Sequence, residues 1–163
     1  MDTSHLAQHA GTAGALFATQ TGIVLTHVPY RSSAQSSIDM ITGRRDMQFA
    51  TVAPTLANIR EGKLRALATT GSRRMAVLPD VPTMMESGVA DYDVSLWMAH
   101  TMPAGTPDEI VNKLNAEMRA ILGDAEVVEA LSKQGFESDP GPPEAVAKRI
   151  QSETEKWRSL VAK

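Results

Sequence analysis

The residues best placed to do chemistry in this sequence are polar side chains that follow three short, β-rich apolar segments. These groups are Tyr30–Ser33 after segment 23–28, Thr51 after segment 46–50, and Thr69-Thr70 at the end of segment 64–69. In open parallel α/β sheets the carboxyl ends of the strands face helix N-termini, whose free N–H groups and dipole favour anions. The pattern predicts a site for a small carboxylate. The same residues would also serve as helix caps and turn residues without binding anything.

Other chemistries have weaker support. His5 and His9 are four residues apart, as two metal ligands on one helix face would be, but a third ligand is missing. No Gly-x-Ser-x-Gly motif accompanies the serines, and the loop 69–74 lacks the Gly-Lys-Ser/Thr ending of a phosphate loop. The absence of cysteine excludes thiolate catalysis and disulfides. We therefore expect no catalytic residue, no metal and no cofactor.

The elements that would position the polar groups alternate between strand and helix. Segments 23–28, 46–50 and 64–69 are predicted strands. The intervening helices are predicted over 12–21, from Ser32 or Ser33 to about Ile41, and over 51–59, with glycines as stops. This alternation predicts βαβ units and a mainly parallel sheet.

A stiff connector, LPDVPTMMESG, spans residues 78–88. Pro79 and Pro82 fix the backbone φ and donate no hydrogen bond, so they fit neither a helix interior nor a central strand. Thr83 can cap a one-turn helix through Ser87 that Gly88 ends.

Beyond the connector, one more strand is predicted over 94–99, and helices follow it. Thr106 to Glu109 has the composition of a capping box with Pro107 at the first helical position. Asp124 is the predicted cap of a shorter helix, and a last helix follows the proline-rich stretch 140–143. Apolar residues recur at helical spacing in the first and last of these helices: Ile110, Leu114, Met118, Ile121 and Leu122, then Val146, Ile150, Trp157, Leu160 and Val161.

The composition of the 163 residues is that of an ordinary globular chain. It is 42% hydrophobic and 21% charged, with a net charge of −3, which argues against nucleic-acid binding. We expect the pairs Arg44-Arg45 and Arg73-Arg74 to be solvated surface. The start, MDTSH, lacks the features of a secretory signal, so the chain as given is expected to stay in the cytoplasm.

Several motifs together resemble the tripartite tricarboxylate transporter substrate-binding proteins, the TctC or Bug family. They are HVPYRSSA (27–34), GRRDMQF (43–49), IREGKLRALA (59–68), LPDVPT (78–83), PAGTP (103–107), LNAE (114–117) and the helix around Trp157. The resemblance covers nearly the whole chain. It implies a periplasmic, two-lobed α/β receptor that closes on small carboxylates and passes them to a membrane permease.

The resemblance also implies a domain layout and a ligand site. Residues 1–88 would be part of the ligand-binding lobe, and residues 89–163 the return strand and C-terminal helices of the other lobe. The proline pair would then stiffen the approach to the hinge. Together with the clustering at the strand ends, the resemblance implies that the ligand-binding residues are Tyr30, Arg31, Ser32, Ser33, Ala50 and Thr51, joined by Thr3, Ser4 and His5.

Two departures from the family pattern bear on these expectations. The chain starts where such a receptor is already within its second lobe, so we expect an N-terminally truncated receptor. Leu16-Phe17 also follows Thr3-Ser4-His5 several residues later than in the family, which indicates an insertion or a foreign start.

Two functions follow from these expectations. The first is a carboxylate-binding receptor fragment that feeds a tripartite transporter. The alternative is a self-associating interaction module without ligand binding, because the amphipathic C-terminal helices would lack a sheet to cover them and a homo-oligomer would bury them. A small hydrolase is disfavoured by the missing nucleophile motif.

Overall fold

The computed structural model of the chain describes residues 4–30 and 32–161, which divide into two compact units. The first unit extends to Leu96 and the second begins at Trp97. The division falls a few residues beyond the predicted boundary at 88. The assignment of the two parts to two receptor lobes stays a prediction.

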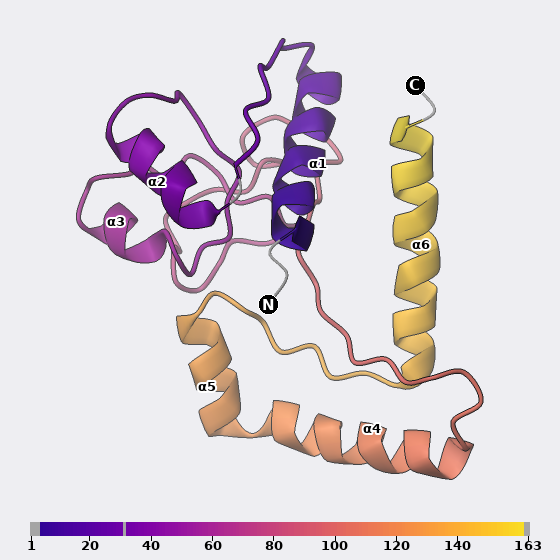
Figure 1. Cartoon of the computed structure of the whole chain (residues 1–163). Helices are drawn as coiled ribbons and strands as arrows, with labels where there is room; N and C mark the ends of the chain where they lie inside the picture. Colours follow the sequence, from indigo (N-terminus) through magenta and orange to yellow (C-terminus); the bar gives the residue numbers. More distant parts are fainter. Residues whose placement is uncertain (1–3, 31, 162–163) are drawn as a thin grey trace. The chain divides into compact units, whose positions relative to one another are not determined.

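The first unit contains three helices: α1 (Ser4–Thr21), α2 (Ser33–Ile41) and α3 (Leu56–Arg60) (Figure 1). The helix predicted over 12–21 is the C-terminal part of α1, and α2 lies where the sequence predicted it. Gly22 and Gly43 follow α1 and α2 with φ of 72° and 71°, the left-handed conformation that glycine adopts without strain.

Helix α3 is shorter than the predicted helix over 51–59. The backbone N–H of Thr55 and of Leu56 both bond to the carbonyl of Val52, so a tight turn precedes the helix. The Thr55 hydroxyl donates back to the carbonyls of Thr51 and Val52, at 3.2 and 3.0 Å. Pro54 disfavours helical backbone at the residue before it, which explains why the helix begins only at Leu56.

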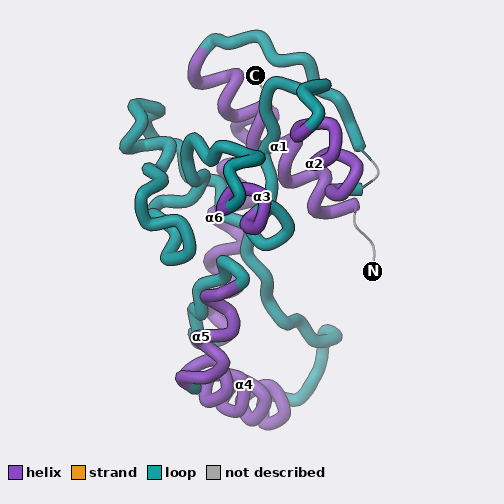
Figure 2. Tube along the Cα trace, turned by 90° about the vertical axis from the view of Figure 1, so that its left-hand side faces the viewer, coloured by secondary structure: helices purple, strands orange, loops and turns teal. Residues whose placement is uncertain are grey.

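The residues that the structure describes contain no β-strand, so the predicted strands 23–28, 46–50, 64–69 and 94–99 are not observed as strands (Figure 2). The single bridge is parallel and joins Thr69 to Thr83. Strand identity depends on a hydrogen-bonded neighbour as well as on composition, and within the described parts of these segments only Thr69 has a bridge partner. Several of their apolar side chains stay in solvent, since Val24 is 94% exposed and Leu67 66%, whereas Val94 is buried.

The core of the first unit is small and centres on Tyr92. This side chain is fully buried, and its hydroxyl donates a 2.8 Å hydrogen bond to the carbonyl of Ala13 in α1. The ring of Phe17 packs against Tyr92 with a centroid distance of 6.4 Å and against Phe49 at 6.0 Å. The other buried apolar residues are Ala13, Leu56 and Val94.

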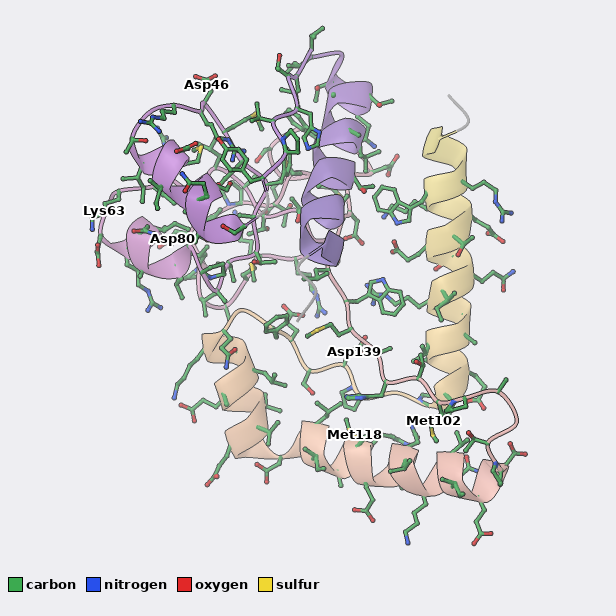
Figure 3. All side chains as sticks on the ribbon, in the orientation of Figure 1. Asp46, Lys63, Asp80, Met102, Met118 and Asp139 are labelled. Carbon is green, nitrogen blue, oxygen red and sulfur yellow. The ribbon has the colours of Figure 1, made fainter. Side chains whose placement is uncertain are left out.

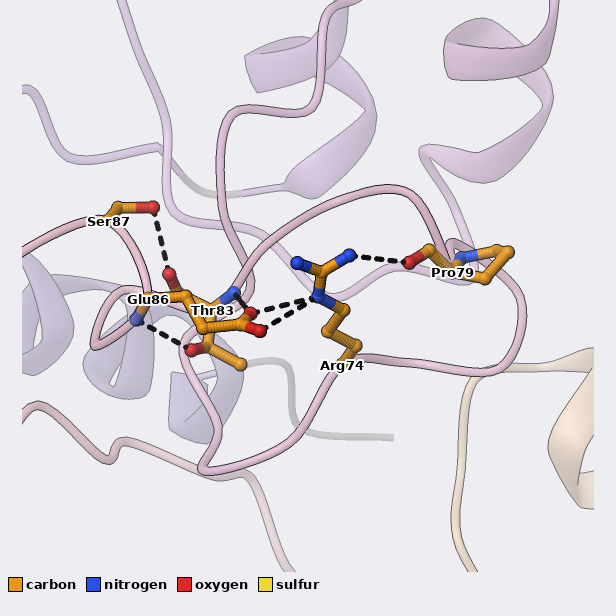
Figure 4. Close-up of polar contacts among 5 residues, drawn as sticks. All are labelled: Arg74, Pro79, Thr83, Glu86 and Ser87. Carbon is orange, nitrogen blue, oxygen red and sulfur yellow. Dashed lines mark hydrogen bonds and ion pairs between the residues drawn. The ribbon is translucent and has the colours of Figure 1, made fainter.

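The connector 78–88 forms hydrogen-bonded turns rather than the predicted one-turn helix (Figure 4). The Thr83 hydroxyl nevertheless accepts from the N–H of Glu86 at 3.1 Å, and the Glu86 carboxylate accepts from the N–H of Thr83 at 2.7 Å. This is the reciprocal pattern of a capping box. Arg74 Nε donates to both Glu86 oxygens, at 2.9 and 3.1 Å, and Arg74 Nη1 donates to the carbonyl of Pro79. The connector is therefore braced at both ends.

The second unit contains α4 (Asp108–Gly123), α5 (Ala125–Lys133) and α6 (Pro143–Val161), as the sequence predicted. Asp124 caps α5, since its Oδ1 accepts from the N–H groups of Glu126 and Val127. The predicted capping box at Thr106 is not formed. Its hydroxyl donates instead to the carbonyl of Pro103 at 2.8 Å, and so it closes the turn that precedes α4.

None of the side chains described in the second unit is buried. The predicted apolar stripe of α4 is about half exposed at Ile110, Leu114 and Ile121. Met118, another residue of this stripe, is labelled in Figure 3. Asn115 Nδ2 donates to the carbonyl of Gly141, which ties the loop before α6 to α4. Within the described residues, no helix is both long and apolar enough to cross a bilayer.

Candidate ligand site

The described part of the predicted site centres on Tyr30, which lies just before α2. Its hydroxyl donates a 2.8 Å hydrogen bond to Asp39 Oδ2 on α2. This bond raises the pKa of Tyr30 and lowers the pKa of the Asp39 carboxyl. The phenol has one O–H donor, and it is used in the hydrogen bond to Asp39. A ligand would therefore find Tyr30 Oη as an acceptor, or would have to compete with Asp39 for the O–H donor.

The guanidinium of Arg45 lies over the aromatic ring of Tyr30. Its guanidinium carbon is 4.5 Å from the centre of the Tyr30 ring, within cation–π distance. Nη1 donates to Ser36 Oγ at 2.5 Å, and Nη2 donates to the Met47 carbonyl at 3.4 Å. The expectation that both arginines of the Arg44-Arg45 pair are solvated surface is therefore wrong for Arg45, which is half-buried, and correct for Arg44.

Ser32 is the N-cap of α2. Its backbone is extended, with φ −146° and ψ 147°, and its Oγ accepts from the N–H of Gln35 at 3.3 Å. The hydroxyl thus satisfies one of the free donors at the start of the helix. Ser33 is the first residue of α2, but its side chain and all of Arg31 lie outside the described residues.

Ala50 and Thr51 end the segment that leads toward α3. Ala50 is exposed and Thr51 half-buried. The predicted helix N-terminus at Thr51 is absent because α3 begins at Leu56 and has only five residues. The expected support from a helix dipole at Thr51 is therefore wrong. Of the two helices that follow Tyr30 and Thr51, α2 is the one long enough to offer a useful N-terminus.

A polar network joins the two parts of the predicted site. Ser36 Oγ, which accepts from Arg45, donates to Gln48 Oε1 at 3.0 Å. Asp39 also accepts from Gln35 at 3.2 Å and pairs with Arg44 at 3.5 Å. Asp46 projects away from this network into solvent (Figure 3). Sequence reasoning missed Asp39, Arg45, Ser36 and Gln48, and the only available signal was that Tyr30 lies near the helix that carries Asp39.

The predicted site also includes three residues at the N-terminus, Thr3, Ser4 and His5. Thr3 lies outside the described residues, and Ser4 and His5 belong to the first turn of α1, where their side chains are not described. Among the described residues, no three His, Asp or Glu side chains come together as a metal site would require.

Thr69 and Thr70, the third polar group, hold the unit together. Thr69 forms the bridge to Thr83 and is buried, and its Oγ1 has no hydrogen-bond partner. The Thr70 carbonyl accepts from the N–H of Val94 at 2.7 Å. Their backbones therefore anchor the connector and the segment that contains Tyr92.

Comparison with known proteins gives this geometry a context. The family of tripartite tricarboxylate transporter receptors (TctC) matches residues 4–163. A protein encoded in the tcbD-tcbE intergenic region of Pseudomonas sp. strain P51 is 39% identical over 150 residues. The alignment covers 91% of this chain and 45% of that protein, so the chain spans less than half of that relative's length.

Three solved structures are also similar. The R. palustris protein Rpa4515 with adipate has a TM-score of 0.83 at 30% identity, over 94% of this chain and 52% of that one. MatC from Rhodopseudomonas palustris with bound malate has a TM-score of 0.78 at 28% identity, over 93% and 53%. The periplasmic binding protein BugD has a TM-score of 0.77 at 29% identity, over 93% of this chain and 51% of that one. The similarity supports the predicted α/β fold class, whereas the described residues contain no sheet.

The family model describes a receptor, and a further similar structure, at 25% identity and a TM-score of 0.76, is a TctC solute binding protein from Polaromonas. With a match that runs from residue 4 to residue 163, the chain belongs to the tripartite tricarboxylate transporter receptor (TctC) family.

Proposed function

We propose that this chain supplies part of a periplasmic receptor for small dicarboxylates that serves a tripartite transporter permease. The observation that carries the proposal is its similarity, over more than nine-tenths of its length, to one receptor with adipate and another with malate. Both ligands carry two carboxylates, whose negative charge is complementary to the N–H donors and the positive dipole end of a helix N-terminus. In this chain, the start of α2 next to Tyr30 and Ser32 is the helix N-terminus to which we assign this role.

The proposal includes the finer fold assignment. Segments 23–28, 46–50 and 64–69 would occupy strand positions of a parallel sheet once neighbouring strands pair with them. Their exposed apolar side chains, Val24 and Leu67 among them, favour this reading. The first unit would then be the ligand-binding lobe, and the second would supply C-terminal helices of the other lobe.

An NMR titration of the chain with malate and adipate tests the proposal. We expect amide shifts at residues 30–36 and 50–52, with roughly millimolar affinity, because one lobe supplies only part of a ligand's hydrogen bonds. Thr51→Val removes a hydroxyl at nearly constant shape and should weaken the shifts at 50–52. No shifts at tens of millimolar ligand would refute the proposal.

A second candidate, the self-associating module, has support from the exposed stripe of α4. Leu114 is 49% exposed, and each large apolar side chain buried on association contributes about 1.5–3 kcal/mol. Light scattering at micromolar concentration should detect a dimer that Leu114→Lys weakens. Asn112→Lys adds the same charge at an exposed polar position of the same helix and should leave the dimer intact. A monomeric wild type would eliminate this candidate.

A further inference from the structure

We propose that Arg45 is a positioning residue of the candidate ligand site: it holds the loop before α2 and the segment 46–51 in one arrangement without itself contacting the ligand. The identity of the ligand in this inference rests on the proposed function. The geometry rests on the contacts of Arg45.

A single guanidinium touches three separate pieces of the first unit. It lies 4.5 Å from the Tyr30 ring, it donates to Ser36 on α2, and it donates to the carbonyl of Met47 in the segment that ends at Thr51. The link from Ser36 to Gln48 doubles the connection between α2 and that segment.

The planar shape of the side chain makes this role specific to arginine. A guanidinium can stack on an aromatic ring and donate in its own plane at the same time, whereas a lysine ammonium is a compact point charge. Two of the three contacts use the terminal nitrogens Nη1 and Nη2 in diverging directions. Lysine would keep the charge but would not make both bonds while covering Tyr30.

The neighbouring residue offers a matched control. The side chain of Arg44 is 73% exposed, and its Nη1 forms an ion pair with Asp39 Oδ1 at 3.5 Å, a weak surface interaction. Arg44→Met and Arg45→Met remove the same charge and the same donors one residue apart. Any difference between them therefore reports the contacts of Arg45 rather than the net charge.

The first readout does not depend on a ligand. The chain has two tyrosines, so the titration of Tyr30 can be followed separately from that of buried Tyr92 by NMR of selectively labelled phenol carbons. Arg45 lowers the pKa of Tyr30 against the larger effect of Asp39, so Arg45→Met should shift the Tyr30 titration to higher pH. Amide resonances in both 30–36 and 47–51 should move as well. Arg44→Met should leave Tyr30 and segment 47–51 in place.

The second readout is malate affinity. If the chain binds malate, Arg45→Met and Arg45→Lys should weaken binding by about tenfold, the factor that corresponds to the loss of one hydrogen bond made by a charged group. Equal affinities of the Arg45 and Arg44 variants would overturn the positioning role. If wild type binds no malate, the proposed function fails, and the Tyr30 titration and amide shifts still decide the inference: unchanged values in Arg45→Met overturn it.

Discussion

Tyr92 is the side chain on which the core of the first unit depends most. It is fully buried, donates to the carbonyl of Ala13 and packs on Phe17. Burial raises the pKa of Tyr92 to about 12, because the phenolate would lose its hydration in this environment. The residue therefore links folding to pH in the alkaline range.

The predicted consequence is a loss of stability above pH 10. Since the folded pKa lies above the unfolded value of 10.0, Tyr92 stabilises the fold fully below pH 10, and this contribution is lost as the pH rises toward about 12. Urea unfolding of wild type and Tyr92→Phe between pH 8 and 12 measures it. The variant should be less stable by about 1 kcal/mol at pH 8, from the lost hydrogen bond, and should decline less steeply at high pH. Parallel declines would contradict the account.

Thr83 makes a second residue-scale prediction. The side chain is buried and its hydroxyl accepts from the N–H of Glu86, so Thr83→Val should cost about 1 kcal/mol, the usual value of such a cap. Hydrogen exchange at the Glu86 amide should then become about fivefold faster. Thr83→Ser keeps the hydroxyl and should stay near the wild-type rate. Equal rates for the two variants would show that the cap contributes nothing.

At the scale of elements, capping chemistry explains which helices could be predicted. Ser32, one of the two candidate caps of α2, and Asp124 were predicted as caps and act as caps, because each lies directly before a helix whose first donors are within reach. Thr106 was predicted from the same pattern but bonds to Pro103 instead. The local sequence does not distinguish a hydroxyl that closes a preceding turn from one that caps the following helix.

The cap of α5 can be tested directly. Asp124 Oδ1 accepts from Glu126 at 2.9 Å and from Val127 at 3.3 Å, so Asp124→Ala should free both amides and destabilise the start of α5 by about 1 kcal/mol. Amide exchange at 126 and 127 should accelerate. Asp124→Asn keeps a capping oxygen and should restore most of the protection, whereas equal acceleration in both variants would assign the effect to charge alone.

The strands could not be predicted with the same security, since a strand needs a neighbour that composition does not reveal. Segment 23–28 has β-rich composition but no ladder in the described residues, whereas Thr69 pairs with Thr83, which lies within the connector. The candidate site was predictable only in part, for the same reason. The role of Ser32 follows from its local sequence, but the contacts of Tyr30 with Asp39 and Arg45 depend on the packing of α2 against the following segment.

Hydrogen exchange distinguishes the two kinds of extended segment. The amides of Thr69 and Met84 are bonded at 2.8 and 2.9 Å, so they should be protected in the chain alone. The amides of Val24 and Leu67 belong to exposed segments and should exchange near the unprotected rate. Strong protection at 24 and 67 would indicate that these segments pair, within the chain or between copies.

At the scale of the whole molecule, the chain combines a small core with a large exposed apolar surface. Four apolar residues are buried among those described, while Val24, Leu67 and Met98 are 94%, 66% and 73% exposed. The chain spans about half of the related receptors, and in the proposed function the remaining half of such a receptor would cover this surface. Affinity for a carboxylate should therefore be weak in the chain alone.

The most direct test of the central claim is calorimetric titration of the chain with malate at neutral pH, compared with the uncharged diamide of malate. A site built on helix donors and their dipole should bind the dianion with roughly millimolar affinity and the diamide not at all. This is the result that the account predicts. Absence of binding heat with malate at tens of millimolar, or equal binding of the diamide, would contradict it.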